Sequence, residues 1–318
     1  MAFDIGTTTV VGTILDLLTG NELSHASQLN AQVVYGEDSI SRIKHVIENH
    51  SGRRDMTEKI KGVINEIIHE AAQKAGIDTN EIYEAVFVGN TTMSHLFLGL
   101  DPAGLSQIPF VPVTNSAVNL KAVDAGIDIN PRGNVYILPN IAGFVGSDTV
   151  GVMLACNYLE TGPTMLAVDV GTNGELALRH DSSLTVCSTA AGPALEGASL
   201  TCGMRAANGA IEHVRITPEA IEYDVIGGAI PIGICGSGII DVIAELLKAG
   251  IIDQNGAMLA QNTLKGKISD YLLKRIIIFD NEPAFLLYEP SGSDRDSRRV
   301  VITQKDVRQI QLAKGAIR

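Results

Sequence analysis

The sequence has few of the residues that a redox centre within the chain would need. Its four cysteines, Cys156, Cys187, Cys202 and Cys235, lie far apart, with no Cys-x-x-Cys pair and no cluster with histidine at metal-ligand spacing. Iron–sulfur clusters are held by closely spaced cysteine thiolates, so none is expected within this chain. Reduced, buried thiols in a cytoplasmic protein are the expectation instead.

Aromatic residues, positive charge and long apolar runs are also scarce. Aromatics make up 4% of the 318 residues, tryptophan is absent, and the formal net charge is −12 with no run of Lys or Arg. Base stacking and phosphate tracking need those residues, so nucleic-acid binding is not expected. No apolar run approaches the ~20 residues that span a bilayer, so no membrane segment is predicted.

The chain nevertheless contains enough apolar material for two hydrophobic cores. Hydrophobic residues make up 45% and charged residues 19% of the sequence, which is typical of an ordered globular protein. At this length, the usual domain size predicts about two domains.

The most informative feature is a turn that occurs twice, as Asp4-Ile5-Gly6-Thr7-Thr8-Thr9 and as Asp169-Val170-Gly171-Thr172-Asn173-Gly174. Each Asp lies in an apolar, β-branched segment, Phe3-Asp4-Ile5 or Ala167-Val168-Asp169-Val170, which predicts a buried strand that carries its Asp to the strand end. Glycine then allows backbone N–H groups to approach an anion closely, and hydroxyl and amide groups add donors. One such turn is common in purely structural hairpins. Two copies, each at the head of a domain-sized segment, favour a phosphate-binding function.

These turns predict a nucleotide site with Mg²⁺. Mg²⁺ keeps most of its water and takes one or two protein carboxylates, here Asp4 and Asp169. The residues predicted to contact phosphate are Gly6, Thr7, Thr8, Thr9, Gly171, Thr172, Asn173 and Gly174.

Three further segments carry candidate site residues. Asn90 and Thr91 follow a predicted strand. They either bind a ligand at the carboxyl edge of the sheet or simply form the start of a capped helix. Glu196 follows a glycine–proline turn, and Gly236 with Ser237 opens another predicted helix. Neither a Walker A loop nor a Gly-x-Gly-x-x-Gly motif is present.

The predicted elements repeat in two halves. The first contains a hairpin over 3–15, a third strand after Asn21, helices over 39–48 and 57–75, a strand over 84–89 and a helix over 93–98. The second contains strands near 164–170, 175–179 and 184–188, then helices, one over 239–247. We therefore predict an α/β protein of duplicated βββαβα units, with domains at 1–160, including a connecting helix over 149–158, and at 161–318.

The paired turns resemble the phosphate loops of the acetate kinase, sugar kinase, Hsp70 and actin superfamily. That resemblance implies a duplicated RNase H-like, actin-like ATPase fold with two domains around a nucleotide cleft. Within the superfamily, nearly the whole chain resembles the large ATPase domain of reductive activators of corrinoid proteins. The segments that carry this resemblance are Val88-Gly89-Asn90-Thr91-Thr92-Met93-Ser94-His95-Leu96, Pro139-Asn140-Ile141-Ala142-Gly143-Phe144-Val145-Gly146-Ser147-Asp148, Gly192-Pro193-Ala194-Leu195-Glu196-Gly197-Ala198 and Ile234-Cys235-Gly236-Ser237-Gly238.

The resemblance implies that ATP binding and hydrolysis are coupled to reduction of cobalt(II) to cobalt(I) in a corrinoid protein of a methyltransferase system. In that family an iron–sulfur domain supplies the electron, and we expect it to lie outside this chain. The family's adenosine-binding Gly-Gly loop and second connecting helix are also expected after Arg318, so we predict weak adenine binding by residues 1–318, testable by calorimetry. Asp148 or Glu196 would orient the attacking water, and the sequence does not choose between them.

Two alternatives remain open at this point. A small-molecule kinase of the same superfamily would need a carboxylate base for its substrate, for which only Asp148 is a candidate in the first half. Phosphate release without a phosphorylated acceptor would favour the ATPase. A nucleotide-free scaffold for the corrinoid protein is the second alternative, and a pull-down with and without ATP would separate it. A homodimer is also left open.

Overall fold

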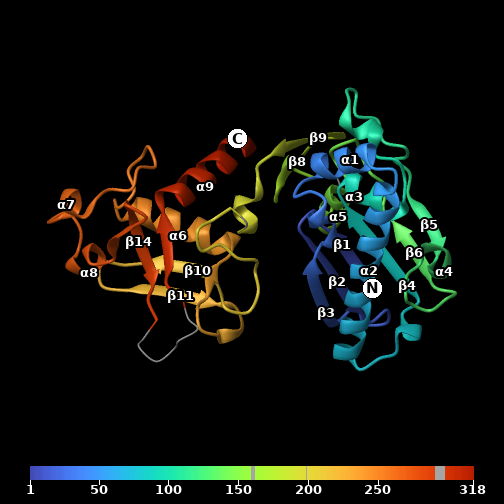
Figure 1. Ribbon diagram of the computed structural model, residues 1–318, viewed down its shortest axis with the longest axis horizontal. Helices are drawn as coiled ribbons and strands as arrows, with labels where there is room; N and C mark the ends of the chain where they lie inside the picture. Colours follow the sequence, from blue (N-terminus) through green and yellow to red (C-terminus); the bar gives the residue numbers. More distant parts are fainter. Residues whose placement is uncertain (159–161, 198, 291–297) are drawn as a thin grey trace. The chain divides into compact units, whose positions relative to one another are not determined.

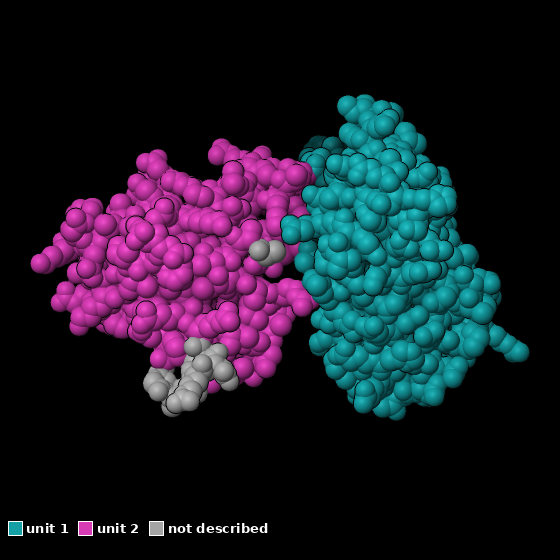
Figure 2. Space-filling view, viewed as in Figure 1, with its two compact units in different colours: residues 1–169, 175–188 teal, residues 170–174, 189–318 magenta. Residues whose placement is uncertain are grey.

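The computed structural model describes residues 1–158, 162–197, 199–290 and 298–318. The chain divides into two compact units, coloured separately in Figure 2. Unit 1 comprises Met1–Asp169 and Glu175–Ser188, and unit 2 comprises Val170–Gly174 and Thr189–Arg318. The predicted domain boundary, between 160 and 161, lies outside the described residues.

Unit 1 is built on a six-stranded sheet with the order β3-β2-β1-β4-β6-β5. The strand β1 pairs antiparallel with β2 and parallel with β4, and β4 pairs parallel with β6. The predicted hairpin and third strand are confirmed. The strands are β1 (Ala2–Ile5), β2 (Thr9–Leu15), β3 (Glu22–Leu29), β4 (Glu84–Gly89), β5 (Val118–Lys121) and β6 (Asn134–Ile137).

The long helix α2 packs on this sheet and supplies much of the first core (Figure 1). Its apolar positions recur at helical spacing, and Met56, Ile60, Ile64 and Ile67 are fully buried. Gly76 ends the helix in the left-handed conformation at φ 69°, which glycine adopts readily. The helices of unit 1 are α1 (Ser39–Glu48), α2 (Gly52–Ala75), α3 (Thr91–Leu98), α4 (Ala122–Ala125) and α5 (Ser147–Ala155), with 3₁₀ turns η1 (Ala31–Val34), η2 (Thr79–Glu81) and η3 (Ala103–Ser106).

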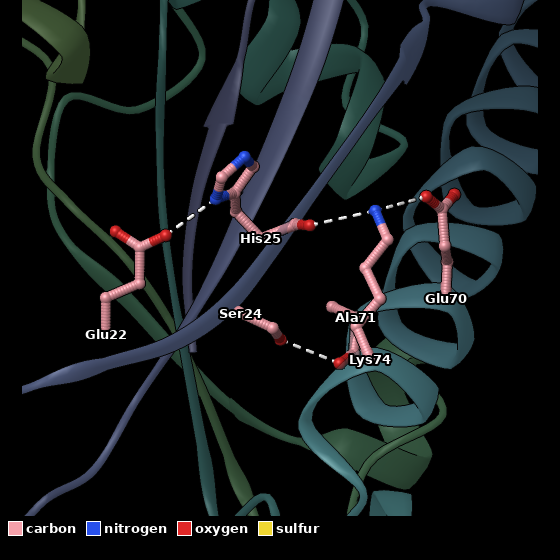
Figure 3. Close-up of polar contacts among 6 residues, drawn as sticks. All are labelled: Glu22, Ser24, His25, Glu70, Ala71 and Lys74. Carbon is pink, nitrogen blue, oxygen red and sulfur yellow. Dashed lines mark hydrogen bonds and ion pairs between the residues drawn. The ribbon is translucent and has the colours of Figure 1, made fainter. Parts of the chain in front are cut away.

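Strand β3 forms one edge of the sheet, and side-chain hydrogen bonds connect it to α2 (Figure 3). Lys74 Nζ donates to the His25 carbonyl at 3.2 Å and to Glu70 Oε1 at 2.7 Å. Ser24 Oγ donates to the Ala71 carbonyl at 2.7 Å. Since an open edge invites pairing with another chain, a lysine over an edge carbonyl protects this sheet.

The second repeat begins with a three-stranded sheet of order β7-β8-β9. Its strands are β7 (Met165–Val170), β8 (Asn173–His180) and β9 (Ser183–Ala190), close to the three strands predicted there. The second turn of the repeated motif joins β7 to β8 and belongs to unit 2.

Most residues of the β7-β8-β9 sheet belong to unit 1, whereas the described part of unit 2 contains the three-stranded sheets β11-β10-β12 and β13-β14-β15. Helix α6 packs with both in the second core, through Ile239, Val242 and Leu246. The elements are η4 (Pro193–Glu196), β10 (Ala210–Ile216), β11 (Ile221–Val225), η5 (Ile226–Gly228), β12 (Gly233–Ile234), α6 (Gly236–Lys248), α7 (Gln261–Leu264), α8 (Asp270–Leu273), β13 (Ile276–Phe279), β14 (Glu282–Tyr288), β15 (Val300–Thr303) and α9 (Gln304–Ile317).

The element order of the second half differs from the simple repeat that the sequence predicted. A hairpin of β10 and β11 stands between the first three strands and α6, where a helix was expected. Thr217 closes this hairpin, with its N–H donating to the Ala220 carbonyl at 2.9 Å. The alternating residues over 210–225 were the available signal for these strands.

Among the described residues, no helix is both long and apolar enough to cross a bilayer.

Candidate nucleotide site

The first turn is a rigid loop between β1 and β2. Gly6 N–H donates to the Thr9 carbonyl at 3.0 Å, and a Cβ at Gly6 would lie 2.5 Å from that oxygen, so only glycine fits. Asn30 Nδ2 donates to the Gly6 carbonyl at 2.9 Å and Arg42 Nη2 to the Thr7 carbonyl at 2.5 Å. Side chains thus bind two carbonyls of the turn.

Asn90 connects this turn to α3. Its Nδ2 donates to Thr7 Oγ1 at 2.9 Å, while its Oδ1 accepts the Met93 N–H at 3.0 Å as the helix cap. Thr91 is fully buried and its hydroxyl donates to the Ala142 carbonyl at 2.6 Å. The capped-helix interpretation therefore describes both residues, and a direct contact with nucleotide stays a prediction.

Carboxylates predicted to act at the site interact electrostatically in unit 1. Asp4 is solvent-accessible at the end of β1, yet it is surrounded by enough protein to lose hydration. That desolvation, followed by repulsion from Asp148 and Asp169, raises the pKa of Asp4 to about 6. Burial and the charge of Asp169 also raise the pKa of Asp148, against hydrogen bonds from Thr149 that lower it. The structure therefore brings Asp4, Asp148 and Asp169 close enough for their charges to interact.

Glu175 joins this cluster and was missed by the sequence analysis. It lies on β8, is 8% exposed and accepts a hydrogen bond from Ser188 Oγ at 3.1 Å. Burial, then Asp148 and Asp169, raise the pKa of Glu175 to about 7. The available signal was a carboxylate that opens an otherwise apolar strand directly after the second turn.

The second turn makes its own carboxylate contact within unit 2. Glu196 Oε1 accepts the Thr172 N–H at 2.9 Å and also the Thr172 hydroxyl. The other oxygen of Glu196, Oε2, is buried and has no hydrogen-bond partner among the described residues. Gly171 N–H donates to the Asn173 carbonyl at 3.1 Å and Gly192 N–H to the Thr172 carbonyl at 2.8 Å, which fix the turn.

Gly236 lies against the segment that carries Glu196. A Cβ on Gly236 would lie 1.9 Å from the Leu195 carbonyl, so the start of α6 packs on η4 only with glycine there. Ser237 is exposed in the first turn of α6. The predicted nucleotide contacts of Gly236 and Ser237, like those of Asn173 and Gly174, stay predictions.

A hydrated Mg²⁺ ion at Asp4 and Asp169 stays a prediction. No group of three or more His, Cys, Asp or Glu side chains in the described ranges is arranged to hold a metal ion directly. Burial is the main cause of the raised pKa values of Asp4 and Glu175, and repulsion from neighbouring carboxylates in unit 1 adds to the rise. A Mg²⁺ ion that keeps its water shell would relieve that repulsion while taking few protein ligands.

The raised pKa of Glu175 predicts how the stability of the protein depends on pH. The pKa of Glu175 is about 7 in the folded protein, against an ordinary 4.5 that the unfolded chain recovers. Between these values the folded state binds more protons, so this group's contribution to stability is lost as pH rises through about 7. Removing it in Glu175→Gln should flatten the thermal midpoint of the ligand-free protein between pH 5 and pH 8. An unchanged slope, measured by circular dichroism, would contradict the assignment.

Comparisons with known proteins match both halves. The family model "RACo middle region" matches residues 1–161, and "C-terminal domain of RACo the ASKHA domain" matches residues 163–318. A solved "Reductive activator for corrinoid,iron-sulfur protein" is 39% identical with a TM-score of 0.89, over 99% of this chain and 49% of that one. The actin-like ATPase fold predicted from the repeated turns is thereby confirmed.

Two curated relatives carry related descriptions. The "Corrinoid activation enzyme RamQ" of Eubacterium limosum is 43% identical over 320 residues, which cover 100% of this chain and 53% of the relative. The "[Co(II) methylated amine-specific corrinoid protein] reductase" of Methanosarcina barkeri is 28% identical over 223 residues, 60% of this chain and 41% of the relative. The chain thus spans about half the length of the curated relatives it matches.

Proposed function

Because the chain belongs to the RACo family of corrinoid reductive activators, we propose that it forms the ATP-dependent part of such an activator. The substrate is the cobalt(II) centre of a corrinoid protein, which gains one electron to become cobalt(I). The electron comes from an iron–sulfur reductant outside this chain. ATP and water yield ADP and phosphate, and the coupling makes an uphill electron transfer possible.

The observation that carries the ATPase part is the convergence of Asp4, Asp148 and Asp169 near the first turn. Phosphoryl transfer requires little covalent chemistry from a protein, so positioning and charge compensation dominate. Asp4 and Asp169 would hold Mg²⁺ through its water, and that ion would offset charge on the phosphates. The backbone and hydroxyls of the first turn, held by Asn90 and Arg42, would bind phosphate oxygens.

The hydrogen bonds of the two candidates favour Glu196 over Asp148 as the group that orients the attacking water. Glu196 Oε1 accepts from Thr172 in the second turn, whereas its buried Oε2 has no hydrogen-bond partner in the described part of the chain and could accept from a water molecule. Asp148 instead accepts from its own helix start through Thr149 N–H at 2.7 Å. We therefore assign water orientation to Glu196 and charge compensation to Asp148.

The test combines the chain with a purified cobalt(II) corrinoid protein, a low-potential reductant, ATP and Mg²⁺. Loss of the cobalt(II) electron paramagnetic resonance signal should require ATP and should be accompanied by free phosphate. ADP in place of ATP is the control. ATP-independent reduction would refute the coupling, and a phosphorylated acceptor in place of free phosphate would identify a kinase.

Replacing Glu196 tests its assigned role. In Glu196→Gln the contact with Thr172 is retained in part, but the acceptor for water is weakened, so ATP turnover should fall about tenfold to a hundredfold with little change in the KM for ATP. Steady-state phosphate release measures both constants. If the KM rises and turnover is unchanged, Glu196 supports the second turn and does not orient water.

A further inference from the structure

An uncharged and partly apolar segment is displayed on unit 1, away from the predicted site residues in sequence. No charged residue occurs from Pro102 to Leu120, although charged residues make up 19% of the chain. Within it, Ile108 is 84% exposed, Val111 58% and Val113 60%. Contiguous exposed aliphatic side chains on a protein surface mark an interaction site more often than single ones do.

This segment, here called the apolar loop (Gln107–Val113), is held in place at several points. Val113 N–H donates to His95 Nε2 at 2.9 Å. The ring of Phe110 packs edge-on against Phe144 with centroids 4.9 Å apart. A Cβ on Gly143 would lie 2.2 Å from the Phe110 carbonyl, so the two backbones touch closely. A braced loop loses little conformational freedom when it binds a partner.

The same contacts connect the apolar loop to the first turn. His95 is buried in α3, and because its Nε2 accepts from Val113, its Nδ1 carries the proton and donates to the Thr91 carbonyl at 2.8 Å. Thr91 follows Asn90, which bonds Thr7 of the first turn. In Figure 1, α1 and α3 lie at the end of the unit where this loop projects. A short chain of hydrogen bonds thus runs from the predicted phosphate site to the surface.

We propose that the apolar loop is a docking surface for an uncharged, apolar face of the corrinoid protein, and that phosphate binding at the first turn adjusts it through Asn90 and His95. The proposal rests on the proposed function. The lack of charge from 102 to 120 favours an apolar partner face over a basic one. A net charge of −12 opposes an anionic membrane as the occupant.

The experiment compares two double variants in binding to the cobalt(II) corrinoid protein used in the reduction test. Ile108→Ser with Val111→Ser removes apolar surface from the loop while leaving the Val113 N–H in place. Leu17→Ser with Leu18→Ser is the matched control, since these aliphatic side chains are 76% and 96% exposed at the β2–β3 turn. We expect the first pair to weaken binding by about tenfold or more and the control by less than about twofold.

Each other outcome is decisive. If wild type and both variants bind and are reduced alike, the docking surface is wrong and the proposed function stands. If wild type neither binds nor reduces the corrinoid protein, the proposed function fails and this proposal fails with it. Loss of self-association by the loop variant, with unchanged corrinoid affinity, would assign the surface to a second copy. Loss of binding to anionic phospholipid vesicles alone would assign it to a membrane.

Amide hydrogen exchange of the wild-type protein tests the coupling separately. With saturating ATP and Mg²⁺, confirmed by calorimetry, the Val113 amide should exchange several-fold more slowly, because its acceptor His95 is fixed through Asn90. The Leu120 amide, in β5, serves as an internal reference. Equal exchange at Val113 with and without bound nucleotide would overturn the coupling.

Discussion

ATP hydrolysis is expected to fall by at least about a hundredfold in Asp169→Asn, because this change removes a carboxylate that would hold hydrated Mg²⁺ beside the phosphates. The side chain keeps its size, so the loss would come from charge and not from packing. Asp181→Asn is the matched control, since Asp181 lies on the turn between β8 and β9 of the same sheet with its side chain 87% exposed. Phosphate release with saturating ATP and Mg²⁺ measures both.

The same substitution is expected to keep or raise the stability of the ligand-free protein. Asp169 is one of the charges that raise the pKa values of Asp4, Asp148 and Glu175, so removing it relieves repulsion in the ligand-free protein. The thermal midpoint of Asp169→Asn should therefore equal or exceed that of wild type at pH 8. A variant that hydrolyses ATP at the wild-type rate would remove Asp169 from the site. A variant that has lost both turnover and folding would show a structural role instead.

The first unit was the more predictable one, and particular residues show why. The apolar residues Phe3 and Ile5 on either side of Asp4 and the isoleucine spacing in α2 report burial directly, so sheet and helix follow from local pattern. Helix starts were less predictable: α2 begins at Gly52 and not at 57. Ser51 is a typical N-cap residue, but the glycine that follows it is a poor helix former, which hid the true start. In unit 2 short strands between glycine-rich turns gave no long periodic window, and the β10–β11 hairpin was overlooked.

The candidate site shows the same limit at the level of side chains. Asp4 and Asp169 could be proposed from the repeated turn, since a motif places its own residues. Glu175 could not, because its significance comes from burial and from the proximity of Asp148, which is carried by a different element. Asn90 was recognised as a helix cap or a ligand, but its bond to Thr7 required the folded arrangement of β1 and β4.

Arg42 was also invisible to sequence patterns, and its replacement should cause a large loss of stability in unit 1. It lies in α1 with no exposed surface and donates to the carbonyls of Gly36 at 2.9 Å and Thr7 at 2.5 Å, and to Gln32 Oε1 at 3.2 Å. Burial lowers the pKa of Arg42 to about 10, with attraction from Asp38 opposing the shift, so the guanidinium remains charged at neutral pH. In the absence of Arg42, these three acceptors would be left without that donor.

We expect Arg42→Met to lower the free energy of unfolding by about 3 kcal/mol or more, because each buried acceptor left unpaired costs about 1–3 kcal/mol. For a unit of this size that corresponds to a fall in the thermal midpoint of roughly 6–12 °C. Arg42→Lys keeps the charge but not the forked geometry, so its thermal midpoint should lie between those of wild type and Arg42→Met. Arg54→Met, at an exposed position of α2, is the matched control and should shift the midpoint by about 2 °C or less.

The consequence for the site follows from the bond between Arg42 and the Thr7 carbonyl. Without it the first turn keeps the bonds from Asn30 and Asn90 but loses the one to the Thr7 carbonyl, so its N–H groups are less well ordered for phosphate. At a temperature where Arg42→Met is still folded, its affinity for ATP with Mg²⁺ should be about tenfold weaker than that of Arg54→Met, measured by calorimetry. If Arg42→Met has the same thermal midpoint and the same affinity for ATP as Arg54→Met, the buried guanidinium neither stabilises α1 nor orders the turn.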